Sequence, residues 1–436
     1  MMIRYFLFLC GIFSLTAEEI VVQLPTQKSL QPIYIAEIHT KNSPFDHTYC
    51  KQLEEVLLFD FEHNGRTHLI PRQVKYEMVL ADENYQKAFY PKIWQDLSTP
   101  YVIKARIENK QLHTAVYVSS SSTVKHFKAL DLSGHLCDDR RLIHRLADGI
   151  FEELFKQPGI AASKILYTYQ TSKNAKDSEI WECDYDGGNA HPLTKEGVQS
   201  LTPISISDDH FLYACYKSGQ TKIFIGHKGQ LLGQSYIHLG GNQFHPALNK
   251  DRSMLAFTSD NQGRNDLFTQ HLINSLPAGK PQQIYAYPKS VTASPTFSPD
   301  GQKIAFVSDQ SGNPKIYLID VTTGSHKRPE AKLLTNQHNS CVCPAWSPDG
   351  QKIAYTAKID GVRQIWIYSV SDQKTAQLTT GPGNKENPTW AENSMHLIYN
   401  TTDGDIYDLY MAHINNPAPV KISKGYGLKH YPSWQH

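Results

Sequence analysis

A short repeated unit constrains the fold of this chain more than any other feature. Each copy places a proline near an apolar residue, and a short turn and a strand-like run follow. The clearest copies are residues 294–306 and 343–355. Six prolines anchor the copies: Pro203, Pro246, Pro295, Pro344, Pro388 and Pro432. Successive prolines are 43, 49, 49, 44 and 44 residues apart. A repeat of about 45 residues with room for four strands predicts a β-propeller.

The most regular part of the repeated unit is a four-residue turn, and the chemistry of its residues explains it. Residues 298–301 and 347–350 both read Ser-Pro-Asp-Gly. Proline presets φ at the first turn position, aspartate bonds back to the backbone, and glycine accepts positive φ. The strand that follows carries apolar residues at adjacent positions, so both of its faces must be covered, as they are between blades. The predicted second strands are 164–169, 211–216, 254–258, 303–307, 352–356 and 396–400.

The phase of the repeat predicts how the ring closes. The first blade begins directly at its second strand, at Lys164, with no proline segment before it. The missing segment is found at the far end as Tyr431-Pro432-Ser433-Trp434. We therefore expect this strand to complete the first blade, because closure removes the exposed sheet edges of an open array. The prediction is a six-bladed propeller over residues 159–436, closed by the C-terminal strand.

Residues 18–158 contain no repeat and mix helix with strand. Residues 33–35, 101–107 and 112–118 have strand character, and the last two flank a short turn that indicates a hairpin. Leu142, Leu146, Ile150 and Leu154 fall on one face of a helix. These patterns predict an α/β N-terminal domain over residues 18–158.

The first seventeen residues have the pattern of a secretory signal peptide. Arg4 gives a positive start, residues 5–13 form a short apolar core, and Ala17 precedes two acidic residues. The apolar run is shorter than the roughly twenty residues of a membrane span. We expect residues 1–17 to be cleaved, with an uncleaved anchor as the alternative, and the rest to be soluble and exported.

The six cysteines after Cys10 are expected to be small buried residues.

The sequence gives little support for catalysis. The net charge is +1, so no long-range field favours nucleic acid. The nucleophile elbow Gly-x-Ser-x-Gly is absent from the sequence, and none of the twenty histidines belongs to a His-Glu-x-x-His motif. We therefore expect no catalytic residue, no cofactor and no metal site.

One mouth of the propeller channel is the candidate binding site. The innermost strand of each blade starts near its proline, so the residues just before the prolines should ring this mouth. Aromatic and histidine side chains among polar groups favour a protein contact, provided that they are exposed. The predicted rim comprises Gln243, Phe244, His245, Ala293, Ser294, Cys341, Val342, Glu386, Asn387, His430 and Tyr431.

With these residues in view, the chain resembles the TolB family of periplasmic propeller proteins of the Tol-Pal system. The resemblance rests on three sequence features: the junction between the two predicted domains at residues 159–167, the repeats that contain Ser-Pro-Asp-Gly, and the C-terminal segment 431–434. It implies a non-enzymatic scaffold that maintains outer-membrane integrity and acts in cell division. The family's propeller binds the peptidoglycan-associated lipoprotein Pal, which would place Phe244, His245, Ala293, Ser294, Glu386, Asn387, His430 and Tyr431 at the Pal-binding rim.

The resemblance also implies a second partner. The family's mature N-terminus is a strand that either folds back or engages TolA, and here this strand would be Glu18, Glu19, Ile20, Val21 and Val22.

The second blade departs from the family's pattern, with Ile204 in place of an aromatic residue. Two alternatives stay open: a secreted propeller that binds a sugar or peptide in its channel through His245, Glu386 and His430, and an enzyme with acid–base pairs in the channel.

Overall fold

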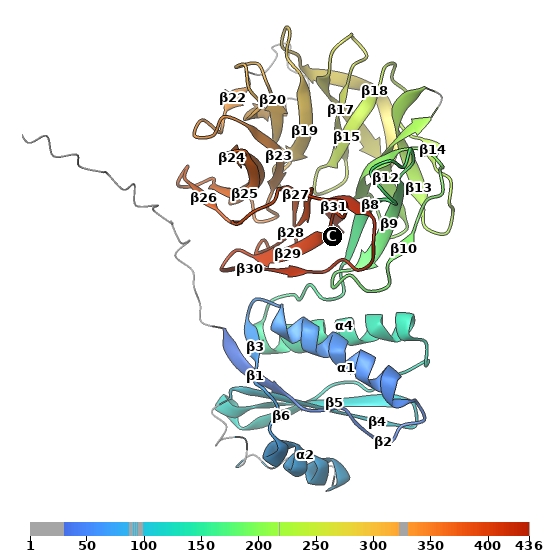
Figure 1. Cartoon of the computed structure of the whole chain (residues 1–436), viewed down its shortest axis with the longest axis vertical. Coiled ribbons are helices and arrows are strands. Elements are labelled where there is room, and N and C mark those ends of the chain that lie inside the picture. The colour runs from blue at the N-terminus through green and yellow to red at the C-terminus, as the bar shows by residue number, and fades with distance from the viewer. Residues whose placement is uncertain are drawn as a thin grey trace, which may run out of the picture.

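The protein consists of a propeller stacked on a smaller α/β unit (Figure 1). The structure, a computed structural model, describes residues 30–435 apart from 87–89, 91, 93, 95–98, 218 and 322–329. The predicted signal peptide and the segment from Glu18 to Val22 lie outside the described residues. Within the described part of the chain, no helix is long and apolar enough to span a membrane.

The predicted propeller is confirmed, with six four-stranded antiparallel sheets among the described residues. The first two blades consist of β31 (Leu428–Trp434), β8 (Lys164–Gln170), β9 (Glu179–Asp184) and β10 (His191–Pro192), and of β11 (Ser200–Ser205), β12 (His210–Lys217), β13 (Gln220–His227) and β14 (Gln234–Ser235). The next two consist of β15 (Gln243–Leu248), β16 (Met254–Ser259), β17 (Asp266–Ile273) and β18 (Leu276–Tyr285), and of β19 (Thr292–Phe297), β20 (Lys303–Ser308), β21 (Lys315–Asp320) and β22 (Lys332–Leu333). The last two consist of β23 (Cys341–Trp346), β24 (Lys352–Ile359), β25 (Val362–Ser369) and β26 (Thr375–Gln377), and of β27 (Lys385–Trp390), β28 (His396–Thr401), β29 (Leu409–His413) and β30 (Asn416–Lys421).

The ring closes as the phase of the repeat predicts. Strand β31 pairs antiparallel with β8, with Leu428 opposite Gln170 and Trp434 opposite Ile165. The inner strands β31, β11, β15, β19, β23 and β27 each contact the next one, and β27 returns to β31. The inner edge of every blade is therefore covered by its neighbours, which is how a propeller avoids open sheet edges.

The tight turns between inner and second strands form through the chemistry of the repeated tetrad. At residues 298–301, Gly301 has φ 69° and its N–H donates to the Ser298 carbonyl at 2.8 Å. The Asp300 carboxylate accepts a hydrogen bond from the Ser298 hydroxyl at 2.5 Å and another from the N–H of Gln302 at 3.0 Å. Each tetrad thus satisfies its own polar groups and sends the chain into the second strand.

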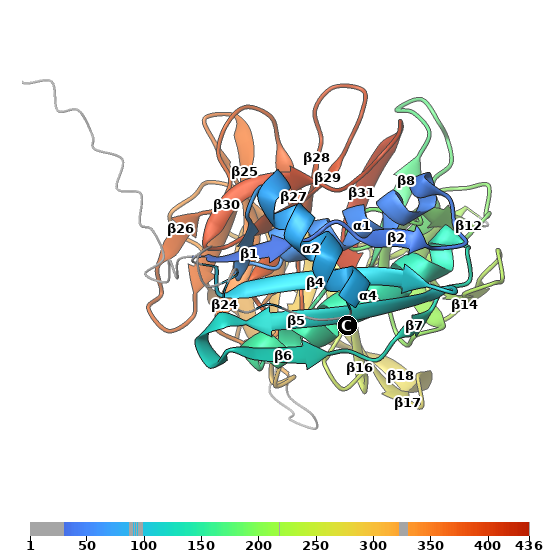
Figure 2. The same ribbon diagram turned by 90° about the horizontal axis from the view of Figure 1, so that it is seen from below.

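The N-terminal unit is a mixed sheet between two layers of helices (Figures 1 and 2). Its main strand order is β3-β1-β4-β5-β6; β2 also pairs with β4, and β7 with β5. The strands are β1 (Gln31–Ile35), β2 (His39–Asn42), β3 (Thr67–Leu69), β4 (Tyr101–Glu108), β5 (Gln111–Val118), β6 (Thr123–His126) and β7 (Leu130–Asp131). The helices are α1 (His47–Glu62), α2 (Val74–Gln86) and α4 (Leu136–Phe155), with the short 3-10 turn η1 (Ser119–Ser121).

Helices α1 and α4 lie between this sheet and the propeller, whereas α2 covers the opposite face of the sheet (Figure 1). Asp46 caps α1 by accepting from the N–H of Tyr49 at 2.8 Å. Helix α4 contains the predicted apolar face in part: Leu146 and Ile150 are buried, whereas Leu142 and Leu154 are half-buried. The main hydrophobic core runs from the sheet through α1 and α4 into the first and last blades without interruption. The two units are thus joined by packed apolar side chains.

Candidate partner-binding rim and domain junction

The six inner strands share one irregularity, which occurs at the residue before each proline. These residues have φ between 47° and 56°, in the left-handed region, and the strand register shifts at the same point in each blade. They are Thr202, His245, Ser294, Cys343, Asn387 and Tyr431, named below the inner ring. A non-glycine residue in this region costs about 1–3 kcal/mol and persists only where its surroundings impose it. The fold therefore sets the backbone of the inner ring, whatever side chain each blade supplies.

Side chains of the inner ring contact one another across blades. The Cys343 thiol donates to Asn387 Oδ1 at 3.1 Å, between the fifth and sixth blades. Asn387 Nδ2 in turn donates to Asn400 Oδ1 at 2.8 Å, and the same oxygen accepts from the N–H of Tyr431 in the first blade at 3.3 Å. Residues from three blades are thus linked by hydrogen bonds into one polar network, which runs through the fully buried Asn400.

A second layer of residues precedes the inner ring by one position. Glu386 accepts from Arg363 Nη1 at 2.8 Å and from the Thr402 hydroxyl at 2.9 Å. The ring of His430 packs edge-on against Tyr407, with centroids 4.6 Å apart. Arg363, Thr402 and Tyr407 lie at or near the ends of connections between second and third strands. These connections therefore reach the same end of the propeller as the predicted rim.

This end of the propeller faces away from the N-terminal unit. In an antiparallel blade, the start of the inner strand lies at the same end as the connection between its second and third strands. The N-terminal unit instead contacts the opposite ends: His63 O with His396 at the start of β28, and Asp60 with Tyr185 after β9. A partner at the rim would leave the N-terminal unit accessible.

The structure corrects the predicted exposure of the rim. All eight residues assigned to partner binding are half-buried, namely Phe244, His245, Ala293, Ser294, Glu386, Asn387, His430 and Tyr431. Contacts with neighbouring blades cover several of these side chains, such as Glu386 against Arg363 and His430 against Tyr407, and the repeat pattern does not reveal such contacts. Gln243 and Cys341 are fully buried, and Gln243 Oε1 accepts from the N–H of Ile223, so neither belongs to the rim surface. Sequence reasoning omitted Thr202 and Cys343, although each directly precedes a repeat proline.

Burial makes most titratable groups of the rim neutral at pH 7. It lowers the pKa of His245 and of His430 to about 4, and it raises the pKa of the Cys343 thiol to about 12. Arg363 forms an ion pair with Glu386, and this hydrogen bond raises the pKa of the Arg363 guanidinium. Neutral donors and acceptors around a single ion pair suit the docking of a polar protein surface.

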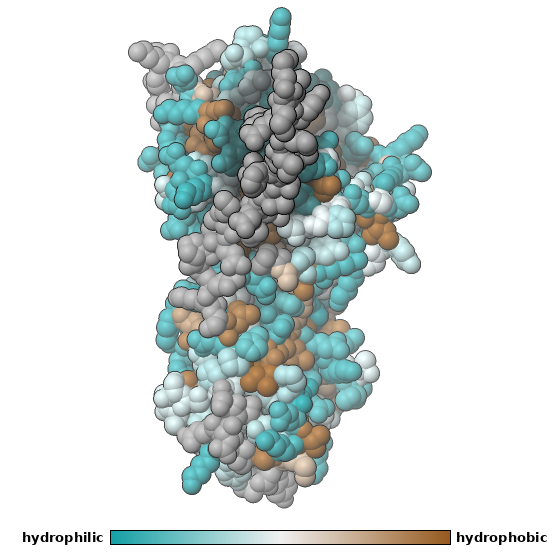
Figure 3. Space-filling view, turned by 60° about the vertical axis from the view of Figure 1, so that its left-hand side comes forward, coloured by the Kyte–Doolittle hydropathy of each residue, from teal (hydrophilic) through white to brown (hydrophobic). Residues whose placement is uncertain are grey.

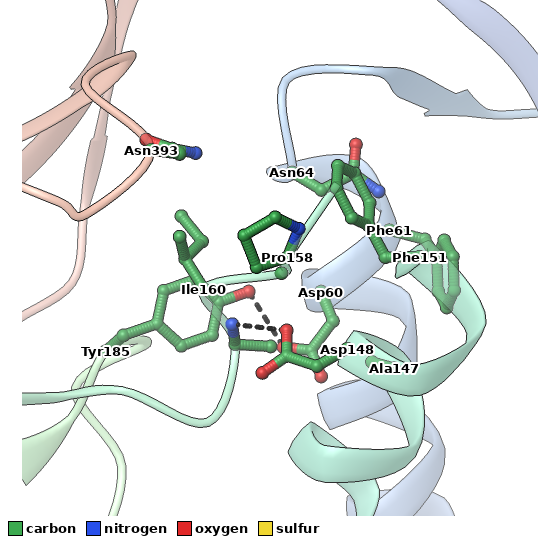
Figure 4. A pocket seen from close by; sticks show the side chains of 12 residues that line it. Asp60, Phe61, Asn64, Ala147, Asp148, Phe151, Pro158, Ile160, Tyr185 and Asn393 are labelled. Carbon is green, nitrogen blue, oxygen red and sulfur yellow. Dashed lines mark hydrogen bonds between the residues drawn. The ribbon is translucent and has the colours of Figure 1, made fainter. Parts of the chain in front are cut away.

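A second candidate region is the junction between the two units, which the sequence did not suggest. The Tyr185 hydroxyl donates to Asp60 Oδ1 at 2.8 Å, and Asp148 accepts from the N–H groups of Ala161 and Ala162, each at 2.8 Å. These groups surround a cavity of about 10 Å³ (Figure 4). A cavity of that size holds about one water molecule, so the junction is closely packed.

The same junction opens into a larger cleft on the side of the fifth and sixth blades. The cleft has a volume of about 960 Å³ and lies between residues 64–66 and 157–158 of the N-terminal side and the turns that follow β25 and β29. Leu30, the first described residue, lines it. The face drawn in Figure 3 is mostly hydrophilic, and its apolar residues form small separate patches.

Comparison with known proteins places these features in a family. A family model described as the TolB β-propeller domain matches residues 151–436. A "Protein TolB homolog" of Protochlamydia amoebophila is 40% identical over 297 residues, which cover 65% of this chain and 63% of that protein. Its namesake in Chlamydia abortus is 35% identical over 284 residues, with 63% and 61% covered. The chain thus aligns with less than two thirds of the length of these relatives.

A solved structure extends the likeness to the fold of both units. The crystal structure of TolB from Acinetobacter baumannii superposes with a TM-score of 0.74 and covers 93% of this chain and 96% of its own. The sequences are 18% identical, so this match concerns the fold. Because the coverage includes the N-terminal unit, the order of an α/β unit before a six-bladed propeller is common to both.

Proposed function

The chain belongs to the TolB β-propeller family, and we propose on that basis that it is a non-enzymatic periplasmic scaffold of the Tol-Pal system. In this proposal the rim binds the peptidoglycan-associated lipoprotein Pal. The segment from Glu18 to Val22 engages a TolA-like inner-membrane protein after cleavage of residues 1–17. The protein would thereby support outer-membrane integrity and envelope constriction during cell division.

The observation that carries the proposal is the hydrogen-bonded polar network that residues of several blades form at one end of the propeller. Cys343, Asn387 and Tyr431 are linked through hydrogen bonds across three blades, and Glu386 adds a fixed charge beside them. A surface held in place before binding loses little conformational freedom when a partner docks, which favours affinity. The same surface can also accept a sugar or peptide, and the experiment below separates the two.

The cleft beside Leu30 supports a folded-back state of the N-terminal segment. Val22 lies eight positions before Leu30, and an extended chain over that distance spans about 26 Å. The segment can therefore reach the cleft of about 960 Å³ while it remains attached to β1. Release from the cleft would then free the segment for a partner, with each partner favouring one of two states.

The test uses the protein without residues 1–17 as bait for a detergent-solubilised envelope extract of its own organism. Mass spectrometry identifies what is retained. We expect a peptidoglycan-linked lipoprotein, and its retention should fall at least tenfold for His245→Ala and Asn387→Ala. Two controls lie away from the rim: His271→Ala near the far end of β17, and Gln282→Ala on the outer strand β18, both exposed. These controls should retain the lipoprotein.

Three outcomes would contradict the proposal. Retention that is unchanged by both rim substitutions would exclude the rim as the binding surface. Equal loss in the controls would indicate a general defect, and thermal unfolding of each variant identifies that case. Retention of no envelope protein, together with binding of a sugar or peptide that the rim substitutions abolish, would favour the small-ligand alternative.

A further inference from the structure

A buried histidine at the domain junction has an arrangement that the packing of the two units does not explain. His144 on α4 is 1% exposed, and its Nδ1 lies 2.9 Å from both carboxylate oxygens of Asp60 on α1. Its Nε2 points toward the propeller, 3.8 Å from Asp186 Oδ1 and 4.0 Å from Asp184 Oδ2. Within the part of the chain that the structure describes, this Nε2 has no hydrogen-bond partner.

The contact with Asp60 decides which ring nitrogen carries the proton. An ionised carboxylate only accepts hydrogen bonds, so Nδ1 is the protonated nitrogen of the neutral ring. Nε2 then presents its lone pair to two further carboxylates. The three ligand atoms, one each from His144, Asp184 and Asp186, all lie within 4.8 Å of one another. A lone pair facing two anionic groups in a buried space is unfavourable unless a proton or a metal cation lies between them.

The charges around this site are also unbalanced. Asp60, Asp184 and Asp186 contribute three negative charges, and Arg140 contributes one positive charge beside the last two. The remainder, −3 + 1 = −2, equals the charge of one divalent cation. Asp148 and Arg141 have opposite charges and also act on the cluster, Asp148 on His144 and Arg141 on Asp184. The side chains of Asp184 and Asp186 are only 4% and 8% exposed, so solvent screens this charge weakly.

We propose that His144, Asp184 and Asp186 bind a divalent transition-metal cation that joins the N-terminal unit to the first blade. One imidazole and two carboxylates suit Zn²⁺ and its first-row neighbours. Asp60 orients the imidazole from behind through Nδ1, which is the usual role of a carboxylate beside a metal-binding histidine. The prediction from sequence was that the chain has no metal site, because its histidines lack a local motif. Here the ligands come from α4, from the last residue of β9 and from the turn after it.

The distances are compatible with this site after a small movement. A cation about 2.1 Å from each ligand atom requires any two of them to be no more than about 4.2 Å apart. The two distances from His144 Nε2 meet this limit. Arg140 bonds to Asp186 through Oδ2, and Asp186 Oδ1 faces the histidine. Asp186 Oδ1 also accepts from the N–H of Gly188 at 2.9 Å, and Asp184 Oδ2 accepts from Asn189 Nδ2 at 2.7 Å, so each oxygen would use a further lone pair for the cation. The remaining coordination position would be taken by water.

The experiment measures metal binding by the purified full chain without a histidine tag. The protein is dialysed against a chelator and then titrated with Co²⁺, whose visible absorption reports coordination by nitrogen and oxygen, and with Zn²⁺ by calorimetry. We expect one equivalent to bind and the Tm to rise. His144→Gln and Asp186→Asn should abolish this equivalent, whereas Asp60→Asn should weaken binding by about 10–100-fold.

Matched controls come from another pair of neighbouring histidines. The rings of His210 and His227 lie 4.6 Å apart in the second blade and are the obvious site of adventitious binding. His227→Gln should leave the bound equivalent unchanged. The cooperative unfolding transition of each variant shows whether it folds. Zinc anomalous scattering from crystals of the unaltered protein gives the position without any substitution.

Three results would overturn the proposal. The first is no binding by the unaltered protein, which would mean that protons alone balance the cluster. The second is one bound metal equivalent that persists in a His144→Gln variant that still folds. The third is anomalous density at His227 or elsewhere rather than beside His144. Because the readouts are metal content and position, they are independent of any partner bound at the rim.

Discussion

The indole Nε1 of Trp434 donates a hydrogen bond to Ser163 Oγ at 2.6 Å, and so ties the final strand of the propeller to the residue just before its first. Next to this contact, Gln435 Nε2 donates to Glu182 Oε2 at 3.0 Å. Trp434 is 3% exposed and belongs to the core that spans both units. Closure of the ring and attachment of the N-terminal unit therefore depend on the same few residues.

Replacing Trp434 with alanine should destabilise the whole protein. Loss of a buried indole costs about 3–5 kcal/mol, and β31 loses its anchor to β8. Denaturant unfolding should show one cooperative transition at lower denaturant, and a chain that ends at His430 should show a larger shift. Trp181→Ala is the matched control, since Trp181 is half-buried on β9 and outside the closure. An equal effect in the control would contradict a special role for closure.

Acid should destabilise the protein in two separate steps. The first involves His245, His413 and His430, whose pKa burial lowers to about 4 in the folded protein. The unfolded chain binds protons at these histidines below about pH 6.5 while the native protein does not, so stability falls between pH 6.5 and 4. His413→Asn should flatten this part of the pH profile of the unfolding free energy. A profile that is level over this range would contradict the prediction.

The second acid step belongs to Glu182. Burial alone would raise the pKa of its carboxyl, but the ammonium groups of Lys164 and Lys228 outweigh burial and hold the pKa at about 2. Its stabilising contribution is complete above about pH 4.5 and is lost as the pH falls toward 2. Glu182→Gln should remove this slope and should also lower stability at pH 7. Unfolding curves collected from pH 5 to pH 2 give the comparison.

The left-handed backbone of the inner ring predicts an unusual pattern of substitution effects. Ser294 has φ 47°, so Ser294→Val should cost about 1–3 kcal/mol because a β-branched side chain fits this conformation poorly. Ser294→Gly should not destabilise, since glycine adopts it freely. Ala293→Val, one residue earlier on the extended strand, is the control. Similar losses for the two valine variants would show that crowding, rather than backbone strain, is responsible.

Thiol reactivity should distinguish one cysteine from the rest. Cys137 is exposed, Cys343 is half-buried, and Cys50, Cys183, Cys215 and Cys341 are buried as free thiols. Burial raises the pKa of Cys215 to about 11, so little reactive thiolate forms at pH 8. A thiol reagent should modify one cysteine quickly in the folded protein lacking residues 1–17, and six after denaturation. Cys137→Ser should abolish the fast phase.

The N-terminal segment should act independently of the rim. Substitutions from Glu19 to Val22 should alter capture of an inner-membrane partner, whereas retention of the lipoprotein at the rim should be largely unchanged. The two regions are separate in the chain, and the rim faces away from the N-terminal unit. Pull-down of both partners from one extract measures the two effects together. Loss of both partners at once would argue against separate sites.

The sequence predicted the propeller because its turns and closure are local patterns. The prolines, the Ser-Pro-Asp-Gly turns and the segment around Trp434 each determine structure within a few residues, and their spacing gives the number of blades. The burial of the rim was not predictable in this way, since the register shift at Asn387 brings side chains from adjacent blades together. The junction was missed for the same reason: 84 residues separate Asp60 from His144, and no local pattern joins them.

Because β31 closes the ring, the propeller can complete its folding only after the C-terminal strand has been synthesised. Strand β8 leaves the ribosome early, but its inner neighbour begins at Leu428, after the strands of the five other blades. Until then the first blade lacks its inner strand, and the core beneath α1 and α4 lacks Trp434. Neither unit can complete its native packing while the chain is still growing. The nascent protein therefore stays short of its final structure for most of its translation.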